Sequence, residues 1–330
     1  ESGVWNPNLL EFAIQMMLML VLGHTLALSK PVSNTISNMV KYCNSTANAA
    51  AIITFTTLLV SLFNWGLGLI FGAIFARKVG EYAAIKKIKL NYPLIGAAGY
   101  SGMMIWHGGI SGSAPIKIAE TGHFLAERIG VISQSKTIFS TMNISISLVL
   151  LIILPICMYY LGKINPGKFI NIIKKEKHES VIITGAERLD HSRLLASIFG
   201  GIIICYAFYK AFFMPEKISL SIITPNYINL VLLGSAILMH QNFFNFIKSV
   251  NNAISGAAGI LIQFPLYFGI MGIMNHSGMV HMMSEFFVTI SNEITFPLFT
   301  FISAGIVNIF VPSGGGQWAV QGPIIIEAAT

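Results

Sequence analysis

Charged residues are scarce in this chain of 330 residues. Asp, Glu, Lys and Arg make up 10% of it, whereas a soluble globular domain carries roughly a quarter. Hydrophobic residues make up 54%, and apolar runs recur along the whole length. Several runs reach the roughly 18 to 20 residues that are needed to cross the hydrocarbon core of a bilayer. The shortage of charge therefore excludes a soluble domain and predicts an all-α polytopic membrane protein.

Cysteine and acidic residues are also few, and their placement excludes several kinds of chemistry. Cys43, Cys157 and Cys205 stand apart, with no CxxC spacing and no companion His, so neither a disulfide framework nor a zinc site is indicated. Glu11 and Glu327 are the acidic residues inside apolar segments, which leaves no carboxylate pair for metal or hydrolytic chemistry. We therefore expect no cofactor and no fixed metal.

The net charge of +7 does not indicate nucleic-acid binding. The Lys and Arg residues lie between apolar segments and do not form a basic face interleaved with aromatic side chains. Their placement is better explained as a topology signal, because Lys and Arg accumulate in cytoplasmic loops. The bilayer is therefore the expected partner, and nucleic acid is not.

Apolar segments and basic connectors divide the chain into two predicted repeats around a linker. The first repeat, residues 1–162, contains a spanning helix, a hairpin at 49–76, a broken helix at 92–130 and a spanning helix at 137–162. A basic cytoplasmic linker follows at 163–193. The second repeat, 194–330, contains spanning helices at 194–213, 227–239 and 254–274 and a hairpin from 294. The chain lacks an initiator Met and stops inside an apolar segment, so we expect an internal portion of a longer protein with a truncated second repeat.

The two hairpins follow from counting basic residues. Arg77–Lys89 and Lys163–Arg193 hold the main clusters. Both clusters are cytoplasmic only if the segment 49–76 enters and leaves on that side, as a re-entrant hairpin bending near Asn64–Gly68. Its arms are then expected to be too short to span. The last segment enters from the opposite face and bends at Pro312–Gly316, as an inverted-topology repeat requires.

Amides support this internal similarity. Gln15 and Asn64 in the first half correspond to Gln263 and Asn308 in the second half. An amide inside a bilayer is costly unless it finds a partner. We therefore predict that these four residues, together with Gly66, support the hairpin turns or contribute to a cation shell.

The second hairpin carries the strongest local motif, which runs from Asn308 to Pro323. Pro312 and Gly314–Gly316 are expected to interrupt the helix, and such backbone is tolerated at membrane depth only where it lines a cavity or contacts a ligand. A helix restarting after the glycines would direct free N–H groups at an anion such as a carboxylate. Ser313 and Gln317 would add side-chain hydrogen bonds. The alternative is a structural hairpin turn without a ligand.

A second break runs from Trp106 to Pro115. Ser111, Gly112 and Ser113 are the predicted binding residues here, facing the carboxylate from the other side. The alternative is an external loop after a short helix. His24 and His107 are the histidines that lie at membrane depth and can relay protons, although a lone His in a helix bundle is more often a structural hydrogen-bonding residue.

The run Val311–Pro323 resembles the bacterial short-chain fatty acid transporter family of the acetoacetate and butyrate uptake type. Further matching stretches are Gln15–Met17, Gly23–Ala27, Asn64–Gly68, Trp106–Pro115 and Gly259–Pro265. The resemblance implies secondary active uptake of a short monocarboxylate across the bacterial inner membrane, coupled to Na⁺ or H⁺. Through the wider ion transporter superfamily it also implies an elevator motion and a homodimer. The Ser-Asn-Thr hairpin tips of that superfamily are absent from both hairpins, so its sodium sites do not carry over.

Other functions remain as alternatives at this point. A dicarboxylate or amino-acid carrier of the same superfamily would share the architecture, and a channel is a third transport class. An intramembrane enzyme would need a nucleophile and a base, for which Ser313 with His24 or His107 is the available combination. The sequence favours a transporter and not an enzyme.

Overall fold

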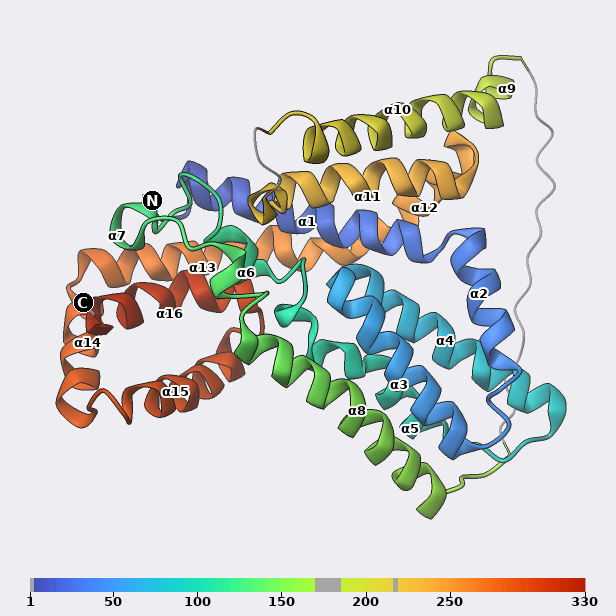
Figure 1. Cartoon of the computed structure of the whole chain (residues 1–330), viewed down its shortest axis with the longest axis horizontal. Helices are drawn as coiled ribbons and strands as arrows, with labels where there is room; N and C mark the ends of the chain where they lie inside the picture. Colours follow the sequence, from blue (N-terminus) through green and yellow to red (C-terminus); the bar gives the residue numbers. More distant parts are fainter. Residues whose placement is uncertain (1–2, 170–184, 216–218, 330) are drawn as a thin grey trace.

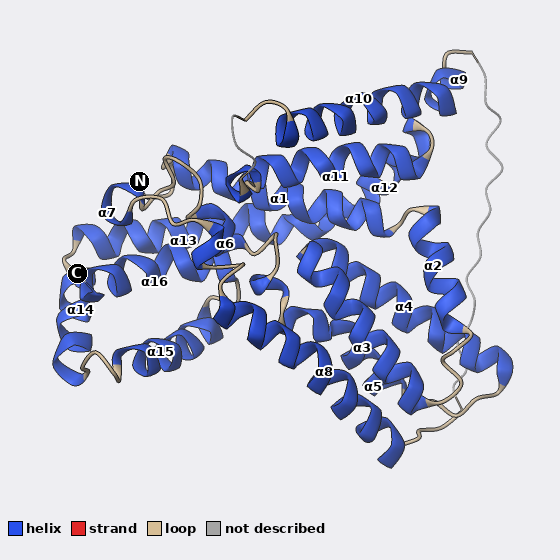
Figure 2. Cartoon of the chain, viewed as in Figure 1, coloured by secondary structure: helices blue, strands red, loops and turns tan. Residues whose placement is uncertain are grey.

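The computed structural model describes residues 3–169, 185–215 and 219–329, and residues 170–184 of the predicted linker lie outside this part. The described residues form helices and loops without a named strand, which confirms the all-α prediction (Figure 2). Among the described residues, five helical segments are long and apolar enough to cross a membrane. They are Pro7–Ala27, Thr46–Phe63, Thr141–Ile164, Arg193–Phe212 and Phe243–His276, the last of which contains a 3₁₀ turn at Ile254–Ala257. The protein is thus a multi-pass membrane protein.

Helix α1 (Pro7–Ala27) lies at the centre of the largest apolar cluster. Asn6 caps it by accepting a hydrogen bond from the amide of Asn8, and Pro7 occupies the first turn, where a missing N–H costs nothing. The helix packs against α4 (Trp65–Lys86), α11 (Pro225–His240) and α13 (Ala258–His276). It also contacts α12 (Phe243–Ala253). Because α1 is buried against four neighbours, it carries apolar side chains on most of its circumference.

The first hairpin consists of α3 (Thr46–Phe63) and α4, joined at Asn64. Asn64 has extended backbone (φ −149°, ψ 124°), and its Oδ1 accepts a hydrogen bond from the amide of Leu67 at 2.7 Å. The break is where the sequence predicts it, but the arms are longer than expected. They contain 18 and 22 residues, or about 27 and 33 Å at roughly 1.5 Å per residue. Both arms are therefore longer than predicted, and α3 is also apolar enough to cross a membrane, whereas α4 is not among the helices that meet this condition.

The longer arms have a local cause. Ser45 caps α3 by accepting a hydrogen bond from the amide of Asn48, so the helix starts before the apolar run does. At the other end, α4 continues past its first basic residues because Phe75, Val79 and Ala83 bury one face of it. Apolarity alone locates neither end.

The second hairpin consists of α15 (Phe296–Phe310) and α16 (Gly314–Ala329), with Val311–Ser313 between them. The expectation that the three glycines leave helical geometry is wrong, because Gly314, Gly315 and Gly316 form the first turn of α16. The break is made by Pro312 and Ser313 instead. Figure 1 shows the two hairpins on opposite sides of the molecule, with their turns facing the centre.

The broken helix lies between the hairpins. It starts as α5 (Tyr92–Tyr100), tightens into 3₁₀ turns at Ser101–Met104 and Trp106–Gly108, and resumes as the short α6 (Ser113–Lys117). The amide of Ile110 donates to the carbonyl of Leu62 at 2.9 Å and so ties this segment to the first hairpin. The α-helix ends at Tyr100, before the predicted break at Trp106.

The remaining helices surround this core. They are α2 (Lys30–Val40), α7 (Ala126–Ile129), α8 (Thr141–Ile164), α9 (Glu187–Asp190), α10 (Arg193–Phe212), α12 (Phe243–Ala253) and α14 (Met279–Ile290). Helix α8 packs along α3, α10 packs along α11, and α14 packs against α16. In the α2–α3 connector, burial raises the pKa of Cys43 to about 12, so this thiol is unreactive.

Candidate functional site

A cavity of about 430 Å³ lies where the second hairpin meets the broken helix, α1, α4 and α13. Apolar side chains make up most of its wall, with a few amides, hydroxyls and one imidazole. The lining residues are Met16, Leu20, Trp65, Leu69, Tyr100, Met103, Trp106, His107, Ser113, Ile260, Gln263, Phe264, Asn308, Pro312, Ser313 and Gly314. None of these residues is Asp, Glu, Lys or Arg. The volume falls in the range of small-molecule sites, roughly 300 to 1,000 Å³.

The amino-terminal end of α16 faces this cavity. Ser313 Oγ accepts a hydrogen bond from the amide of Gly316 at 3.3 Å, and the Ser313 carbonyl accepts one from the amide of Gln317 at 2.7 Å. The amides of Gly314 and Gly315 have no acceptor among the described residues. Two free N–H groups and the positive end of the helix dipole thus lie where the sequence predicts an anion.

The three glycines bring this helix end close to its neighbours. A Cβ on Gly314 would lie 2.7 Å from Nε2 of His107, and one on Gly315 would lie 2.6 Å from Cζ of Phe12. A Cβ on Gly316 would lie 2.5 Å from Cδ2 of Tyr267. Each distance is below van der Waals contact, so no larger residue fits without displacing its neighbour. The glycine run is a close-packing device that holds α16 against the broken helix, α1 and α13.

The turn of the first hairpin is hydrogen-bonded to the broken helix. Ser111 Oγ accepts a hydrogen bond from the amide of Trp65 at 3.0 Å, which extends the capping of α4 by Asn64. The Asn64 Nδ2 and the Ser113 Oγ are buried and have no partner among the described residues. Buried polar atoms are normally satisfied, and Ser113 lines the cavity. Its hydroxyl is therefore available to a bound molecule.

Glycines also set the spacing at this turn. A Cβ on Gly66 would lie 3.0 Å from the Cα of Leu20 on α1, and one on Gly112 would lie 2.2 Å from the carbonyl oxygen of His107. Both positions support the turn geometry by close packing. Trp65 and Trp106, which flank the turn and the break, meet edge to face with ring centroids 6.0 Å apart and form one wall of the cavity.

Gln317 is oriented away from the cavity, in contrast to its predicted contact with the carboxylate. Its Nε2 donates to the Ala304 carbonyl at 2.8 Å and to Oε1 of Gln321 at 3.1 Å, while its Oε1 accepts from Nδ2 of Asn308 at 2.9 Å. The amide thereby ties α16 to α15. Asn308 both joins this bond and lines the cavity, and Gln263 lines it from α13.

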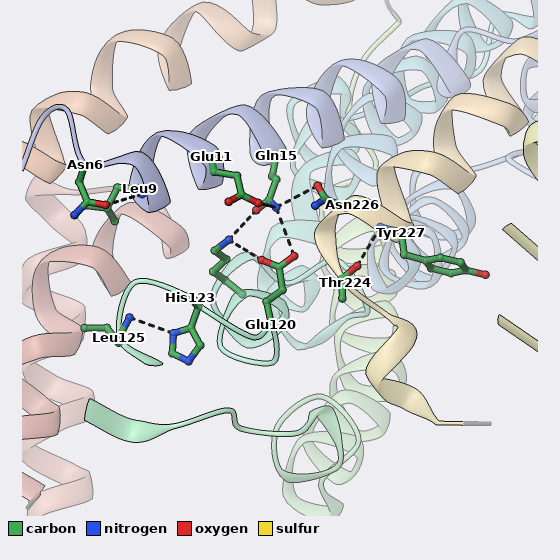
Figure 3. A network of polar contacts seen from close by, with 11 residues as sticks. Asn6, Leu9, Glu11, Gln15, Glu120, His123, Leu125, Thr224, Asn226 and Tyr227 are labelled. Carbon is green, nitrogen blue, oxygen red and sulfur yellow. Dashed lines mark hydrogen bonds and ion pairs between the residues drawn. The ribbon is translucent and has the colours of Figure 1, made fainter. Parts of the chain in front are cut away.

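Gln15 is not among the cavity-lining residues; it is the centre of a separate polar network (Figure 3). Its Nε2 donates to Glu11 at 2.9 Å and to Asn226 at 3.2 Å, and its Oε1 accepts from Nζ of Lys117 at 3.2 Å. Lys117 also forms a 2.6 Å ion pair with Glu120. The partners of Gln15 thus come from α1, α11 and the segment after the break, and not from the hairpin turns.

The sequence pattern does not indicate that the charge of Lys117 is buried. Its side chain is 3% exposed. The available signal was the spacing of Lys117 and Glu120, which places opposite charges on one helical face.

Nearby, His123 accepts a hydrogen bond at Nδ1 from the amide of Leu125 (Figure 3), and its Nε2 donates to the Gly130 carbonyl, which fixes a neutral tautomer.

Comparison with known proteins matches the whole chain to one family. Residues 1–330 match the family described as Short chain fatty acid transporter. A protein of Escherichia coli (strain K12) and one of Haemophilus influenzae (strain ATCC 51907) both carry the name "Putative short-chain fatty acid transporter". Each is 35% identical to this chain, and the alignments cover 99% of this chain and 74% of each relative. No solved structure matches the chain.

Proposed function

Because the chain belongs to the short-chain fatty acid transporter family, we propose that it carries short monocarboxylates such as butyrate or acetoacetate across the bacterial inner membrane. Family membership confirms the resemblance that rests on the run Val311–Pro323. The family is one of transporters and not of enzymes. The apolar helices place the chain in a bilayer.

The observation that carries this proposal is the cavity at the amino-terminal end of α16. A short fatty acid has a carboxylate at one end and an alkyl tail at the other. Gly314 and Ser113 line the cavity, and the free amide of Gly314 and the unpartnered hydroxyl of Ser113 provide donors for the carboxylate. The free amide of Gly315 follows in the same helical turn. Met16, Leu20 and other apolar side chains of the wall provide contacts for the tail.

The lining also favours one carboxylate over two. No Lys or Arg lines the cavity, so one negative charge is met by backbone dipoles and by a coupled cation. A second carboxylate would be desolvated against an apolar wall without a partner, which is costly. A dicarboxylate carrier is the second candidate, and competition by succinate discriminates it from a monocarboxylate carrier.

The arrangement of the hairpins supports alternating access by an elevator-type motion with cation coupling. Their turns face the centre of the molecule from opposite sides (Figure 1), and Trp65 of the first hairpin and Ser313 of the second line the cavity. The carboxyl-terminal ends of α4 and α8, next to the basic clusters, lie on one side, and α7 and α14 lie on the other side (Figure 1). By the positive-inside rule the first side is cytoplasmic. We include in the proposal the homodimer that the resemblance implies.

Uptake of labelled butyrate into proteoliposomes tests this function. Ser313→Leu and Gly314→Leu fill the cavity end of α16, and we expect each to abolish the protein-dependent initial rate. Gly305→Leu is the matched control in the same hairpin, because a Cβ at Gly305 meets nothing within 4 Å. Protein-free liposomes correct for passive entry of the undissociated acid. Undiminished butyrate uptake by both cavity variants would reject the site, and preferential inhibition by succinate would indicate the dicarboxylate carrier.

A further inference from the structure

His107 lines the cavity next to the amino-terminal end of α16. It lies in the 3₁₀ turn Trp106–Gly108 of the broken helix, and its ring lies against the first residue of α16. A Cβ on Gly314 would lie between 2.6 and 3.0 Å from three atoms of the imidazole. The side chain is exposed to the cavity, and no described residue hydrogen-bonds to either ring nitrogen. The predicted carboxylate site and this imidazole are therefore adjacent.

Among the described residues that line the cavity, His107 is the one whose side chain type changes charge around neutral pH. The cavity residues from α1, α4 and α13 are apolar side chains and Gln263, and those from the second hairpin are Asn308, Pro312, Ser313 and Gly314. The broken helix adds Tyr100 but no carboxylate or amine. Asn143 of α8 contacts the neighbouring Gly108 and is uncharged. The buried Lys117 forms an ion pair with Glu120 and lies 6.0 Å from the ring of Phe12, outside the cavity lining.

We propose that His107 is the coupling-proton site of this carrier, and this proposal rests on the monocarboxylate function above. The imidazole takes a proton from the solvent on one side of the membrane when a carboxylate binds at the end of α16. It returns the proton to the solvent on the other side when the carboxylate leaves.

Electrostatics requires the two events to be linked. An unpaired carboxylate or imidazolium in an apolar cavity is costly, whereas the two together form a charge-assisted hydrogen bond. Each ligand therefore strengthens the binding of the other by the same factor. The anion and the proton then cross the bilayer as a pair without net charge.

Proton uptake by the purified protein tests this assignment. Butyrate is added to the protein in detergent at pH 7 without sodium, in weak buffer with a pH-indicator dye, and butyrate binding is measured in parallel. We expect the wild-type protein to take up close to one proton per butyrate bound. His107→Gln should take up none and should bind butyrate roughly tenfold or more weakly, since a hydrogen bond between charged groups is lost.

His24→Gln is the matched control, because His24 lies on α1 and is not among the cavity-lining residues. It should keep the proton uptake of the wild-type protein. Butyrate binding by the wild-type protein without proton uptake, or only with sodium present, would overturn the proton site and leave the monocarboxylate function standing. Unchanged proton uptake in a monodisperse His107→Gln variant would overturn it as well. Failure of the wild-type protein to bind any short monocarboxylate would overturn the function and the proton site together.

Discussion

Lys117 is a buried cation in a molecule with few charges. Its ammonium is held by Glu120 and by Oε1 of Gln15, so the charge is both paired and hydrogen-bonded. Such a pair adds little net stability compared with apolar residues of the same size, but losing one partner leaves the other charge buried and unpaired. The network therefore connects α1, α11 and the segment after the break. Replacing one of its charged residues is expected to lower the stability of the protein.

We expect Lys117→Met to destabilise the protein by about 3 to 5 kcal/mol, the usual cost of breaking a buried pair. The Lys117→Met/Glu120→Gln double variant should recover part of the loss. Arg77→Met is the control, because the Arg77 side chain in the Arg77–Glu81 pair is 66% exposed and surface pairs contribute about 0 to 1 kcal/mol. Thermal unfolding in one detergent measures all three, and equal shifts for Lys117→Met and Arg77→Met would contradict the account.

At the scale of elements, glycines determine how α4 crosses α5. A Cβ on Gly72 would lie 1.9 Å from the carbonyl oxygen of Gly99, and one on Gly99 would lie 2.6 Å from the carbonyl oxygen of Gly72. The two backbones are therefore in direct contact. Close approach through small residues is a general way for helices to associate in membranes, where lipid removes the hydrophobic driving force between them.

Gly99→Ala should consequently separate α4 from α5, at a cost of about 1 to 3 kcal/mol for overpacking. Gly96→Ala on the same helix is the control, because a Cβ there meets nothing within 4 Å. Alanine favours helix over glycine by up to about 1 kcal/mol, so Gly96→Ala should be neutral or stabilising. The measurement is the melting temperature in detergent, and a higher value for Gly99→Ala would be incompatible with the observed contact.

The hairpin breaks could be predicted from the sequence because Asn, Pro and Ser act locally. Asn64 and Ser313 each accept a hydrogen bond from an amide in the first turn of the following helix, and Pro312 cannot continue a helix. Arm lengths could not be predicted, since α4 continues through its basic residues by burying Phe75 and Val79. The orientation of Gln317 toward α15 depends on tertiary contacts that no local pattern contains.

On the scale of the whole molecule, the two hairpins and the basic connectors imply one membrane orientation. The hairpins approach the centre from opposite sides (Figure 1). The α4–α5 connector contains Lys87 and Lys89, whereas the α14–α15 connector contains no Lys or Arg. By the positive-inside rule we expect these two connectors on opposite faces of the membrane.

Cysteine accessibility tests this orientation. In a chain whose three native cysteines are replaced by Ala, we expect Lys87→Cys to react with a membrane-impermeant maleimide only in inside-out vesicles. Glu293→Cys, in the α14–α15 connector, should react only in right-side-out vesicles. Permeabilised vesicles control for intrinsic reactivity. Labelling of both positions from the same side would contradict opposed hairpins.

The sequence predicted part of the cavity wall but not its full composition. Five of the predicted site residues line the cavity, namely Ser113, Gln263, Asn308, Ser313 and Gly314. The apolar wall from α1 and α13 was not singled out, because residues such as Met16 and Phe264 cannot be distinguished from ordinary core residues in one sequence. Gln15 is an amide in an apolar helix, as a site residue would be. It nevertheless belongs to the Lys117 network, whose members come together only in the folded chain.

The central claim is that a short carboxylate occupies the cavity at the amino-terminal end of α16. The most direct measurement is protection of Ser313→Cys, in the chain without native cysteines, from a water-soluble methanethiosulfonate reagent. We predict that butyrate slows the modification in a saturable way, with half-protection at the concentration that half-saturates uptake, while Glu293→Cys reacts at the same rate with and without butyrate. A variant that transports butyrate but whose cysteine at position 313 is modified at an unchanged rate at saturating butyrate would contradict the account.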